Sequence, residues 1–317
     1  MKPPPLLEIS NLHIGFSTNG KITPAVRGVS FSLEKGETLA IVGESGSGKS
    51  VTALSIARLI PSPPVIYQDG RICFEGTNLL TLLEDQLRKF RGGRIAYIFQ
   101  EAATSLNPVY SIRSQMAEMI QLHRPEIEDI NAEIIDWLKI VGITSPQDRL
   151  QSYPHQLSGG MQQRIMIAMA LCARPDLLIA DEPTTALDVT IQAQILAKLR
   201  ELVGTSHRPS TTASASLMPC DALSEISSPN PTLSIHDGES QAKQKLGMAL
   251  ILITHNFAII RGLARKVAVM HRGQIVEYGE TDQVLSNPQH PYTQALIACI
   301  PRLDTRLRRL PTIERSV

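Results

Sequence analysis

The chain has 317 residues, of which 43% are hydrophobic and 19% charged, a composition that excludes an intrinsically disordered protein. Its 31 basic and 30 acidic residues leave a formal charge of +1, which excludes the overall basic bias of a nucleic-acid-binding protein. No apolar run approaches the ~20 residues that span a bilayer. We expect a globular cytoplasmic protein that could still dock on a membrane partner. Its four scattered cysteines form no C-x-x-C pair and indicate reduced thiols without a metal site of that spacing.

Two β-like segments open the chain, Leu6 to Phe16 and Val26 to Leu33, and Asn19-Gly20 marks a turn between them. Their alternation of apolar and polar residues predicts an antiparallel β layer. Phe16 ends the first strand and could stack on an adenine ring, although an aromatic residue in this position is more often part of the core.

Residues 43–50 read GESGSGKS, between an apolar run, Thr38 to Val42, and a segment of helical spacing, Val51 to Ile60, which Pro61 is expected to close. A glycine-rich turn between a strand and a helix is typical of a phosphate-binding loop, since its backbone N–H groups and the helix dipole face an anion. Lys49 would reach the β- and γ-phosphates, and the Ser50 hydroxyl would ligate Mg²⁺. The alternative, a flexible Gly/Ser linker, fits the flanking strand and helix poorly. The predicted nucleotide-binding residues are Gly43, Glu44, Ser45, Gly46, Ser47, Gly48, Lys49, Ser50 and Val51.

The next part of the chain predicts a strand at 70–74, a helix at 84–90 and a buried strand at 94–99 that ends at Gln100. Ligands of such folds bind at the carboxyl ends of the strands, so Gln100 could hold Mg²⁺ or orient a water molecule. It could equally be a solvated loop residue. Residues 111–123 and 131–141 have helical apolar spacing and predict a helical insert between two parts of an α/β core.

A second glycine-containing helix start follows at Leu157-Ser158-Gly159-Gly160-Met161, before a helix predicted over 162–173. Ser158 is a natural N-cap, and the two glycines allow another backbone or a phosphate to approach closely. An ordinary capped helix is the alternative for this pentapeptide alone.

Two acids, Asp181 and Glu182, follow the apolar run Leu177 to Ala180, which predicts a buried parallel strand. Asp181 suits the outer shell of Mg²⁺, and Glu182 suits the base that takes a proton from water. Asp188 could cross to a partner subunit. After a helix at 190–203, a second buried strand at 249–253 leads to His255, which could bridge phosphate and water or be structural.

Taken together, these motifs resemble the ATP-binding subunits of ABC transporters. The matching parts are the phosphate loop at 43–50, Gln100, the LSGGM signature at 157–161, the acid pair at 181–182, Asp188 and His255, and they cover nearly the whole chain except 204–246. GESGSGKS at 43–50, TSLNP at 104–108, MQQR at 161–164 and HPYTQAL at 290–296 resemble the oligopeptide/dipeptide importer branch, which also includes nickel-type importers.

The resemblance implies an α/β phosphate-loop NTPase fold: a parallel sheet flanked by helices, an N-terminal antiparallel β layer and an inserted helical subdomain. It implies a head-to-tail pair of ATPase subunits, identical or related, with two ATP molecules between them. The signature runs from Leu157 to Met161. Its three middle residues, Ser158, Gly159 and Gly160, would contact the γ-phosphate of the ATP bound to the phosphate loop of the partner subunit. The catalytic residues would be Glu182, His255 and Gln100, with Ser50, Gln100 and Asp181 at Mg²⁺ and Phe16 at the adenine.

The same resemblance implies ATP hydrolysis coupled to the uptake of peptides or a similar small solute, at the cytoplasmic face of a bacterial-type membrane. Two transmembrane permease subunits would dock on the helical subdomain, an extracytoplasmic solute-binding protein would take part indirectly, and nucleic acid would not. One competing hypothesis is a soluble ABC ATPase acting on ribosomes or nucleic acid, which is expected to carry tandem cassettes or a long coiled-coil insertion. Another is a phosphate-loop kinase or GTPase, which would not need LSGGM or a base directly after the Mg²⁺ acid.

We expect a single ABC ATPase domain over 1–317. Its expected parts are the β layer and phosphate-loop core (1–99), the helical subdomain (100–156), the signature helix and the rest of the core (157–203 and 247–280), an insertion (204–246) and a C-terminal extension (281–317). The insertion contains no Phe, Trp or Tyr and is rich in Ser, Thr and Pro, which predicts a disordered excursion that catalysis tolerates. With only Cys299 near the C-terminus, no iron–sulfur cluster is expected.

Overall fold

The computed structural model describes residues 3–184, 189–203 and 247–299. The insertion at 204–246, the predicted dimer contact Asp188 and the chain after Cys299 lie outside the described residues. Within the described part, no helix combines the length and the hydrophobicity needed to cross a bilayer.

A six-stranded sheet carries the centre of the molecule, in the order β10-β9-β3-β8-β7-β6. All neighbours pair in parallel except β10, which runs antiparallel to β9. The strands are β3 (Thr38–Val42), β6 (Ile95–Ile98), β7 (Leu177–Asp181), β8 (Ala249–Ile253), β9 (Lys266–His271) and β10 (Gln274–Glu280). Every residue of β3, β7 and β8 is buried, as expected for parallel strands covered on both faces.

A second, antiparallel sheet has the order β2-β1-β4-β5 and confirms the predicted N-terminal β layer. Its strands are β1 (Leu7–Thr18), β2 (Lys21–Leu33), β4 (Val65–Phe74) and β5 (Thr77–Asn78). Asn19 and Gly20 both have positive φ, 51° and 77°, which suits the tight turn that joins β1 to β2. The large apolar side chains of this layer share one core cluster with α1 (Lys49–Ile56) and with one face of the parallel sheet.

The first helix is shorter than the sequence predicted. α1 ends at Ile56 rather than at Ile60, so the expectation that Pro61 closes it was wrong. Arg58 adopts a left-handed conformation with φ of 51°, and the Arg91 guanidinium donates hydrogen bonds to the carbonyl oxygens of Ala57 and Arg58, both at 2.8 Å. An arginine more than thirty positions away in sequence therefore satisfies the carbonyls that a longer helix would have bonded.

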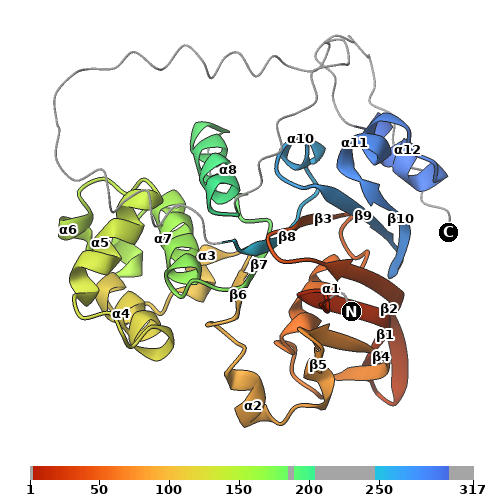
Figure 1. The fold of residues 1–317 in the computed structure, drawn as a ribbon, viewed down its shortest axis with the longest axis horizontal. Helices are drawn as coiled ribbons and strands as arrows, with labels where there is room; N and C mark the ends of the chain where they lie inside the picture. The colour runs from red at the N-terminus through yellow and green to blue at the C-terminus, as the bar shows by residue number, and fades with distance from the viewer. Residues whose placement is uncertain (1–2, 185–188, 204–246, 300–317) are drawn as a thin grey trace.

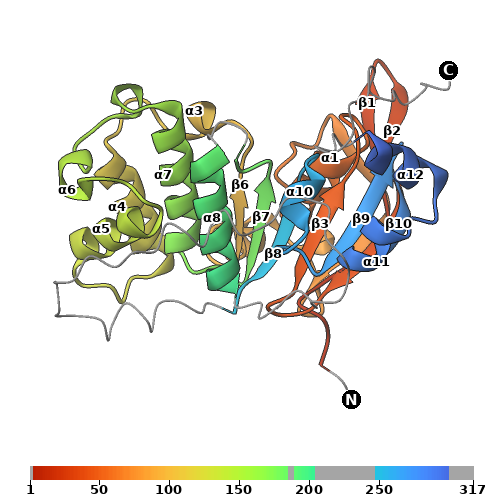
Figure 2. The ribbon, with the colours of Figure 1, turned by 90° about the horizontal axis from the view of Figure 1, so that it is seen from above.

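A helical group, α3 to α7, lies at the β6 end of the parallel sheet, on the opposite side from the antiparallel layer (Figures 1 and 2). Its members are α3 (Ala102–Ser105), α4 (Ile112–His123), α5 (Ile130–Ile140), α6 (Pro146–Arg149), the 3₁₀ turn Pro154–Gln156 and α7 (Gly159–Cys172). Ser111 caps α4 by accepting from the Ser114 N–H at 3.2 Å, and Asp129 caps α5 by accepting from the Ala132 N–H at 2.9 Å. α7, which begins within the LSGGM signature, packs against α3, α4 and α5 and is therefore the central helix of this group.

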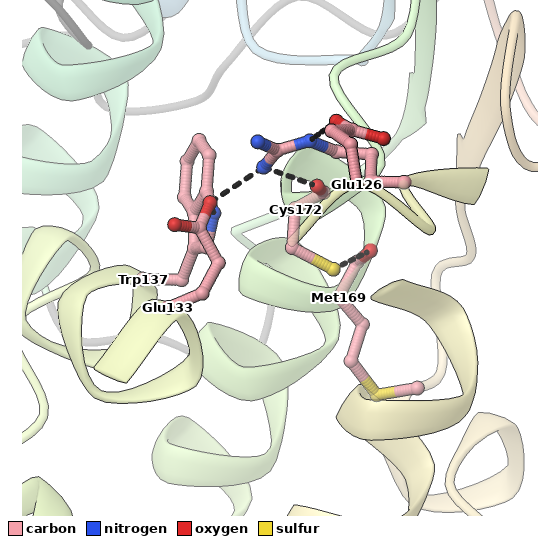
Figure 3. Close-up of polar contacts among 6 residues, drawn as sticks. Glu126, Glu133, Trp137, Met169 and Cys172 are labelled. Atoms are coloured by element: carbon pink, nitrogen blue, oxygen red, sulfur yellow. Dashed lines mark hydrogen bonds and ion pairs between the residues drawn. The ribbon is translucent and has the colours of Figure 1, made fainter. Parts of the chain in front are cut away.

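A buried ion pair crosses the interior of the helical group. Arg124, just after α4, pairs with Glu133 of α5, and the two side chains are 9% and 7% exposed. The Trp137 indole donates to the same Glu133 oxygen at 3.0 Å, and Arg124 also reaches the carbonyl oxygen of Cys172 at the end of α7, at 3.4 Å (Figure 3). Burial raises the pKa of the Cys172 thiol to about 12, so this cysteine stays protonated.

The remaining helices cover the other parts of the parallel sheet. They are α8 (Val189–Val203), α10 (Phe257–Ile260), α11 (Thr281–Ser286) and α12 (Pro291–Ala298), together with the short α2 (Glu84–Arg88) and the 3₁₀ turn Leu79–Thr81 beside the antiparallel layer. α11 and α12 lie beside β9 and β10 at the edge of the sheet (Figures 1 and 2). The carbonyl oxygens of Val203 and Gly247, which flank the insertion, both lie close to Gly36, before β3 begins, and thus opposite the edge where β3 meets the glycine-rich turn.

Candidate functional site

The carboxyl ends of four parallel strands converge on one pocket of about 290 Å³, which we call the strand-edge pocket. β3 leads into the glycine-rich turn, while β6, β7 and β8 contribute polar residues at their ends or within two positions after them. The lining comprises Gly43, Ser45, Gly46, Gly48, Lys49, Ser50 and Val51 of the turn, with Gln100, Asp181, Glu182, His255 and Ala25. The structure therefore brings Gly43 and His255, which are 212 positions apart, into one site, because parallel strands deliver their ends to one edge.

Two glycines in the turn occupy positions that no other residue could take without a shift of backbone. A Cβ on Gly43, whose φ is 152°, would lie 2.2 Å from the carbonyl oxygen of Met270. A Cβ on Gly48, whose φ is 101°, would lie 2.7 Å from the carbonyl oxygen of Ala25. The turn is thus packed tightly against neighbouring backbone, which fixes the path of its amides.

Lys49 curls back into the turn that precedes it. Its ammonium donates to the carbonyl oxygens of Gly43 and Glu44 at 2.8 and 2.7 Å and to the Ser47 hydroxyl at 3.4 Å, so three acceptors meet its three N–H groups. Burial lowers the pKa of Lys49, while the acidic side chains of Glu182, Asp181 and Glu44 oppose that shift. Lys49 also lines the strand-edge pocket, so its positive charge would attract an anion that enters there.

Asp181 ends β7 and is only 6% exposed. The Tyr97 hydroxyl of β6 donates to its Oδ2 at 3.0 Å, and the Ser50 hydroxyl is a second hydrogen-bond partner. Burial raises the pKa of Asp181 despite these two donors, and burial beside Asp181 raises the pKa of Tyr97 well above its usual range. Tyr97 was not predicted as a site residue, because an inward tyrosine within an apolar strand looks like a core residue.

Glu182 occupies a strained backbone position at the edge of the pocket. Its φ is 46°, a left-handed conformation that costs a non-glycine residue of order 1–3 kcal/mol, and its N–H donates to the carbonyl oxygen of Ile253 at 2.9 Å. Its Oε1 lies 2.7 Å from His255 Nδ1, and its Oε2 accepts from Gln100 Nε2 at 3.1 Å. Three strand ends thus form one hydrogen-bonded row, Gln100, Glu182 and His255. A carboxylate oxygen can only accept, so a hydrogen bond from His255 to it requires the proton to be on Nδ1.

The signature residues lie elsewhere on the molecule. Ser158 caps α7, accepting from the Met161 N–H at 3.4 Å, and a Cβ on Gly159 would meet nothing within 4 Å. Leu157 is buried in the core of the helical group, and none of residues 157–161 lines the strand-edge pocket. The helix is nevertheless linked to the acid pair, because the buried Gln163 donates to the carbonyl oxygen of Pro183 at 2.6 Å, a contact that the sequence did not indicate.

Phe16 also lies outside the pocket lining. It pairs with Thr23 of β2 and Val65 of β4 and packs, partly buried, against the core of the antiparallel layer. Its adenine-stacking role stays a prediction.

Comparison with known families and proteins gives consistent matches. The family described as "ABC transporter" matches residues 26–185, and "Oligopeptide/dipeptide transporter, C-terminal region" matches residues 276–317. The oligopeptide transport ATP-binding protein OppD of Bacillus subtilis (strain 168) is 43% identical over 95% of this chain and 73% of its own length. The dipeptide transport ATP-binding protein DppD of the same organism is 42% identical, over 98% of this chain and 81% of its own length.

A longer relative and a solved structure also match this chain. The chain spans about half the length, 49%, of the uncharacterized ABC transporter ATP-binding protein YejF of Escherichia coli (strain K12), with 47% identity over 94% of this chain. The fold resembles that of the dimeric ATP-binding cassette MJ0796 bound to ADP and Pi, with a TM-score of 0.67, 22% identity, and coverage of 87% of this chain and 98% of that one.

Proposed function

This chain belongs to the ABC transporter family, and from that premise we propose that it is the ATP-hydrolysing subunit of an importer for peptides or a similar small solute. The observation that carries the proposal is the hydrogen-bonded row of Gln100, Glu182 and His255 beside the glycine-rich turn. A triphosphate lying on the turn would present its terminal phosphate to a carboxylate that two neighbouring side chains hold in place.

The residues of the strand-edge pocket fit Mg²⁺ and a nucleoside triphosphate. Ser50, Asp181 and the carbonyl oxygen of Gln100 offer hard oxygen ligands, and Ser50 and Asp181 are already hydrogen-bonded to each other. Within the described residues no group of three or more His, Cys, Asp or Glu could hold a metal, so the remaining ligands would be phosphate oxygens and water. When bound, Mg²⁺ supplies charge neutralisation at the phosphates.

The chain's own residues would divide the work of hydrolysis. The amides of the turn and Lys49 would bind and orient the phosphates, with Lys49 exchanging its two backbone carbonyl contacts for phosphate oxygens. Glu182 would accept the proton of the attacking water, and His255 and Gln100 would hold the carboxylate in the orientation that this transfer needs.

A second subunit would complete the site. Ser158 and Gly159 are exposed at the start of α7 and lie outside the pocket of their own chain, which supports a head-to-tail dimer in which they contact the γ-phosphate bound to the partner. The neighbouring fold MJ0796 is itself a dimeric cassette. Asp188 and Phe16 keep their predicted roles at the dimer contact and the adenine within this proposal.

The helical group would receive the membrane-embedded permease subunits at the cytoplasmic face of the membrane. Val109 and Tyr110 are 72% and 54% exposed, and Tyr153 is 39% exposed. The Ile112 N–H donates to the Ser152 carbonyl oxygen at 2.9 Å, which brings the segment of Tyr110 next to that of Tyr153. An exposed apolar surface close in sequence to Gln100 suits a partner that senses the nucleotide. The peptide-transporter C-terminal region favours this assignment over a soluble ATPase acting on nucleic acid or ribosomes.

The proposal is tested by measuring mass in solution with and without Mg-ATP. Glu182→Gln should bind ATP without hydrolysing it and should double in mass, because the nucleotide is trapped between two chains. Adding Ser158→Arg should return the protein to monomer while ATP still binds to the turn. A Glu182→Gln protein that binds ATP yet stays monomeric would contradict the sandwich, and co-purification with nucleic acid instead of permeases would favour the alternative.

A further inference from the structure

The C-terminal helix α12 makes a direct contact with the glycine-rich turn. The Tyr292 hydroxyl accepts a hydrogen bond from the Glu44 N–H at 3.1 Å, across 248 positions of sequence. Tyr292 is only 8% exposed, and its ring belongs to the core cluster between the sheet and α11 and α12. We propose that Tyr292 is a positioning residue for nucleotide binding, which fixes the Gly43–Glu44 peptide of the phosphate-binding turn. This inference rests on the proposed nucleotide site.

One peptide group is held at both of its ends. The carbonyl oxygen of Gly43 accepts from Lys49 Nζ at 2.8 Å, and the N–H of the same peptide, on Glu44, donates to Tyr292. The C=O and N–H of a trans peptide point in opposite directions, so Lys49 and Tyr292 hold the group from opposite sides. Rotation of this peptide would break both hydrogen bonds.

The hydrogen bond from Glu44 to Tyr292 restrains a peptide that follows a glycine, the residue type with the most freedom in φ. Gly43 has a φ of 152° and no Cβ, so its backbone has more conformational freedom than that of any other residue type. When Lys49 leaves the Gly43 carbonyl for a phosphate, the contact from Tyr292 is the one that remains. The hydroxyl would therefore keep the turn in its binding conformation while the lysine changes partners.

Tyr292 can serve as a fixed point because several contacts immobilise it. Its ring stacks on His271 at the end of β9, with centroids 4.1 Å apart and planes 23° apart. Its N–H donates to Nδ1 of His290 at 3.1 Å, which caps the start of α12. The Glu277 carboxylate of β10 accepts from the N–H groups of Gln289 and His290, at 2.8 and 3.1 Å. The start of α12 is thereby fastened to the sheet that carries the turn.

The contact should affect binding more than chemistry. Gln100, Glu182 and His255 come from other strand ends, and the hydrogen bonds that join these three residues to one another do not involve Tyr292. Loss of the hydroxyl should therefore raise the Kd and the KM for nucleotide and leave kcat at saturating ATP nearly unchanged.

The experiment compares wild type, Tyr292→Phe and Tyr278→Phe. Tyr292→Phe keeps the ring on His271 and removes only the hydroxyl. Tyr278→Phe removes the hydroxyl of a tyrosine on β10 that is 41% exposed, and it is the matched control. Calorimetric titration with Mg-ADP should show about threefold to tenfold weaker binding for Tyr292→Phe alone, the effect of one hydrogen bond. Hydrogen–deuterium exchange of a peptide covering 43–48 should be faster in that variant only.

The outcomes separate the two proposals. If wild type bound no Mg-ADP, that result would contradict the proposed nucleotide site and, with it, the proposed role of Tyr292. Wild type that binds, with Tyr292→Phe binding equally well, would overturn the inference alone. A fall in kcat at unchanged affinity, or faster exchange throughout β10 to α12 instead of at 43–48, would also overturn it, since either would show a role other than positioning the turn.

Discussion

The strand-edge pocket and the interior of the helical group both contain charged side chains, which are partnered in different ways. In the pocket, Lys49, Asp181 and Glu182 hydrogen-bond mainly to backbone or to neutral side chains, and Glu182 has a left-handed backbone. In the helical group, Arg124 and Glu133 pair directly with each other, and Trp137 donates to the same carboxylate (Figure 3).

The two clusters differ in whether an opposite charge already neutralises their buried charges. Lys49 and Asp181 have pKa values shifted by burial, downward for the lysine and upward for the acid, so each is less stable in its charged form than it would be in water. Such groups gain stability when opposite charge arrives, as on a nucleotide with its metal. The Arg124–Glu133 pair already contains its opposite charge and ties the ends of α4 and α7 to α5. Substitutions in the two clusters should therefore separate activity from stability.

The largest effect is expected in the pocket. Glu182→Gln should slow ATP hydrolysis by roughly 10²–10⁴, because the amide cannot accept the proton of water. Gln keeps an oxygen and nearly the same shape, so nucleotide affinity and the melting temperature should change little. Steady-state ATPase rates and Mg-ADP titration check both parts, and hydrolysis at the wild-type rate would remove Glu182 from its proposed role.

The next largest effect is expected in the helical group. Arg124→Met should lower the free energy of unfolding by about 3–5 kcal/mol, because it removes the cation that faces the buried Glu133 carboxylate. The affinity for Mg-ADP in the protein that remains folded should stay as in wild type. Denaturant titration and calorimetry would check this pair of results. A change of less than about 1 kcal/mol, the usual size for a surface pair, would show that the pair is not desolvated in solution.

A double substitution refines the same comparison. Arg124→Met with Glu133→Gln removes both charges and keeps a side-chain oxygen for the Trp137 indole. Most of the stability lost in Arg124→Met should return, since no uncompensated buried charge remains. Recovery of less than half of the loss would indicate that Arg124 stabilises the fold mainly through its contact with the Cys172 carbonyl and its packing.

The smallest effect should have the opposite sign and depend on pH. The folded-state pKa of Asp181 is raised by burial, so the folded state holds the proton more readily than the unfolded chain, and ionisation costs stability as pH rises through the raised pKa. Asp181→Asn should therefore melt at a higher temperature than nucleotide-free wild type at pH 7. The gain should vanish below the ordinary carboxyl pKa. Melting curves at several pH values check the trend, and a variant that is less stable at pH 7 would contradict it.

Much of the architecture could be predicted from local pattern. The runs at 38–42, 177–180 and 249–253 predicted strands, the last two of them buried, and they form β3, β7 and β8. The polar residues directly after the strands were predicted to share an edge, and the structure places Gln100, Asp181, Glu182 and His255 in one pocket. The end of α1 was not predictable in the same way, because Arg91 reaches back to it from a distant loop.

The sequence by itself determined the glycine-rich turn, the strand ends that carry the acids and the cap of the signature helix, because each depends on residues adjacent in the chain. Only the tertiary structure decided that Tyr97 would reach Asp181, that Gln163 would reach Pro183 and that Tyr292 would hold the Glu44 amide. Those contacts join segments between 20 and 248 positions apart. Local periodicity carries no information about which distant side chain fills a given space, since packing of the whole core sets that choice.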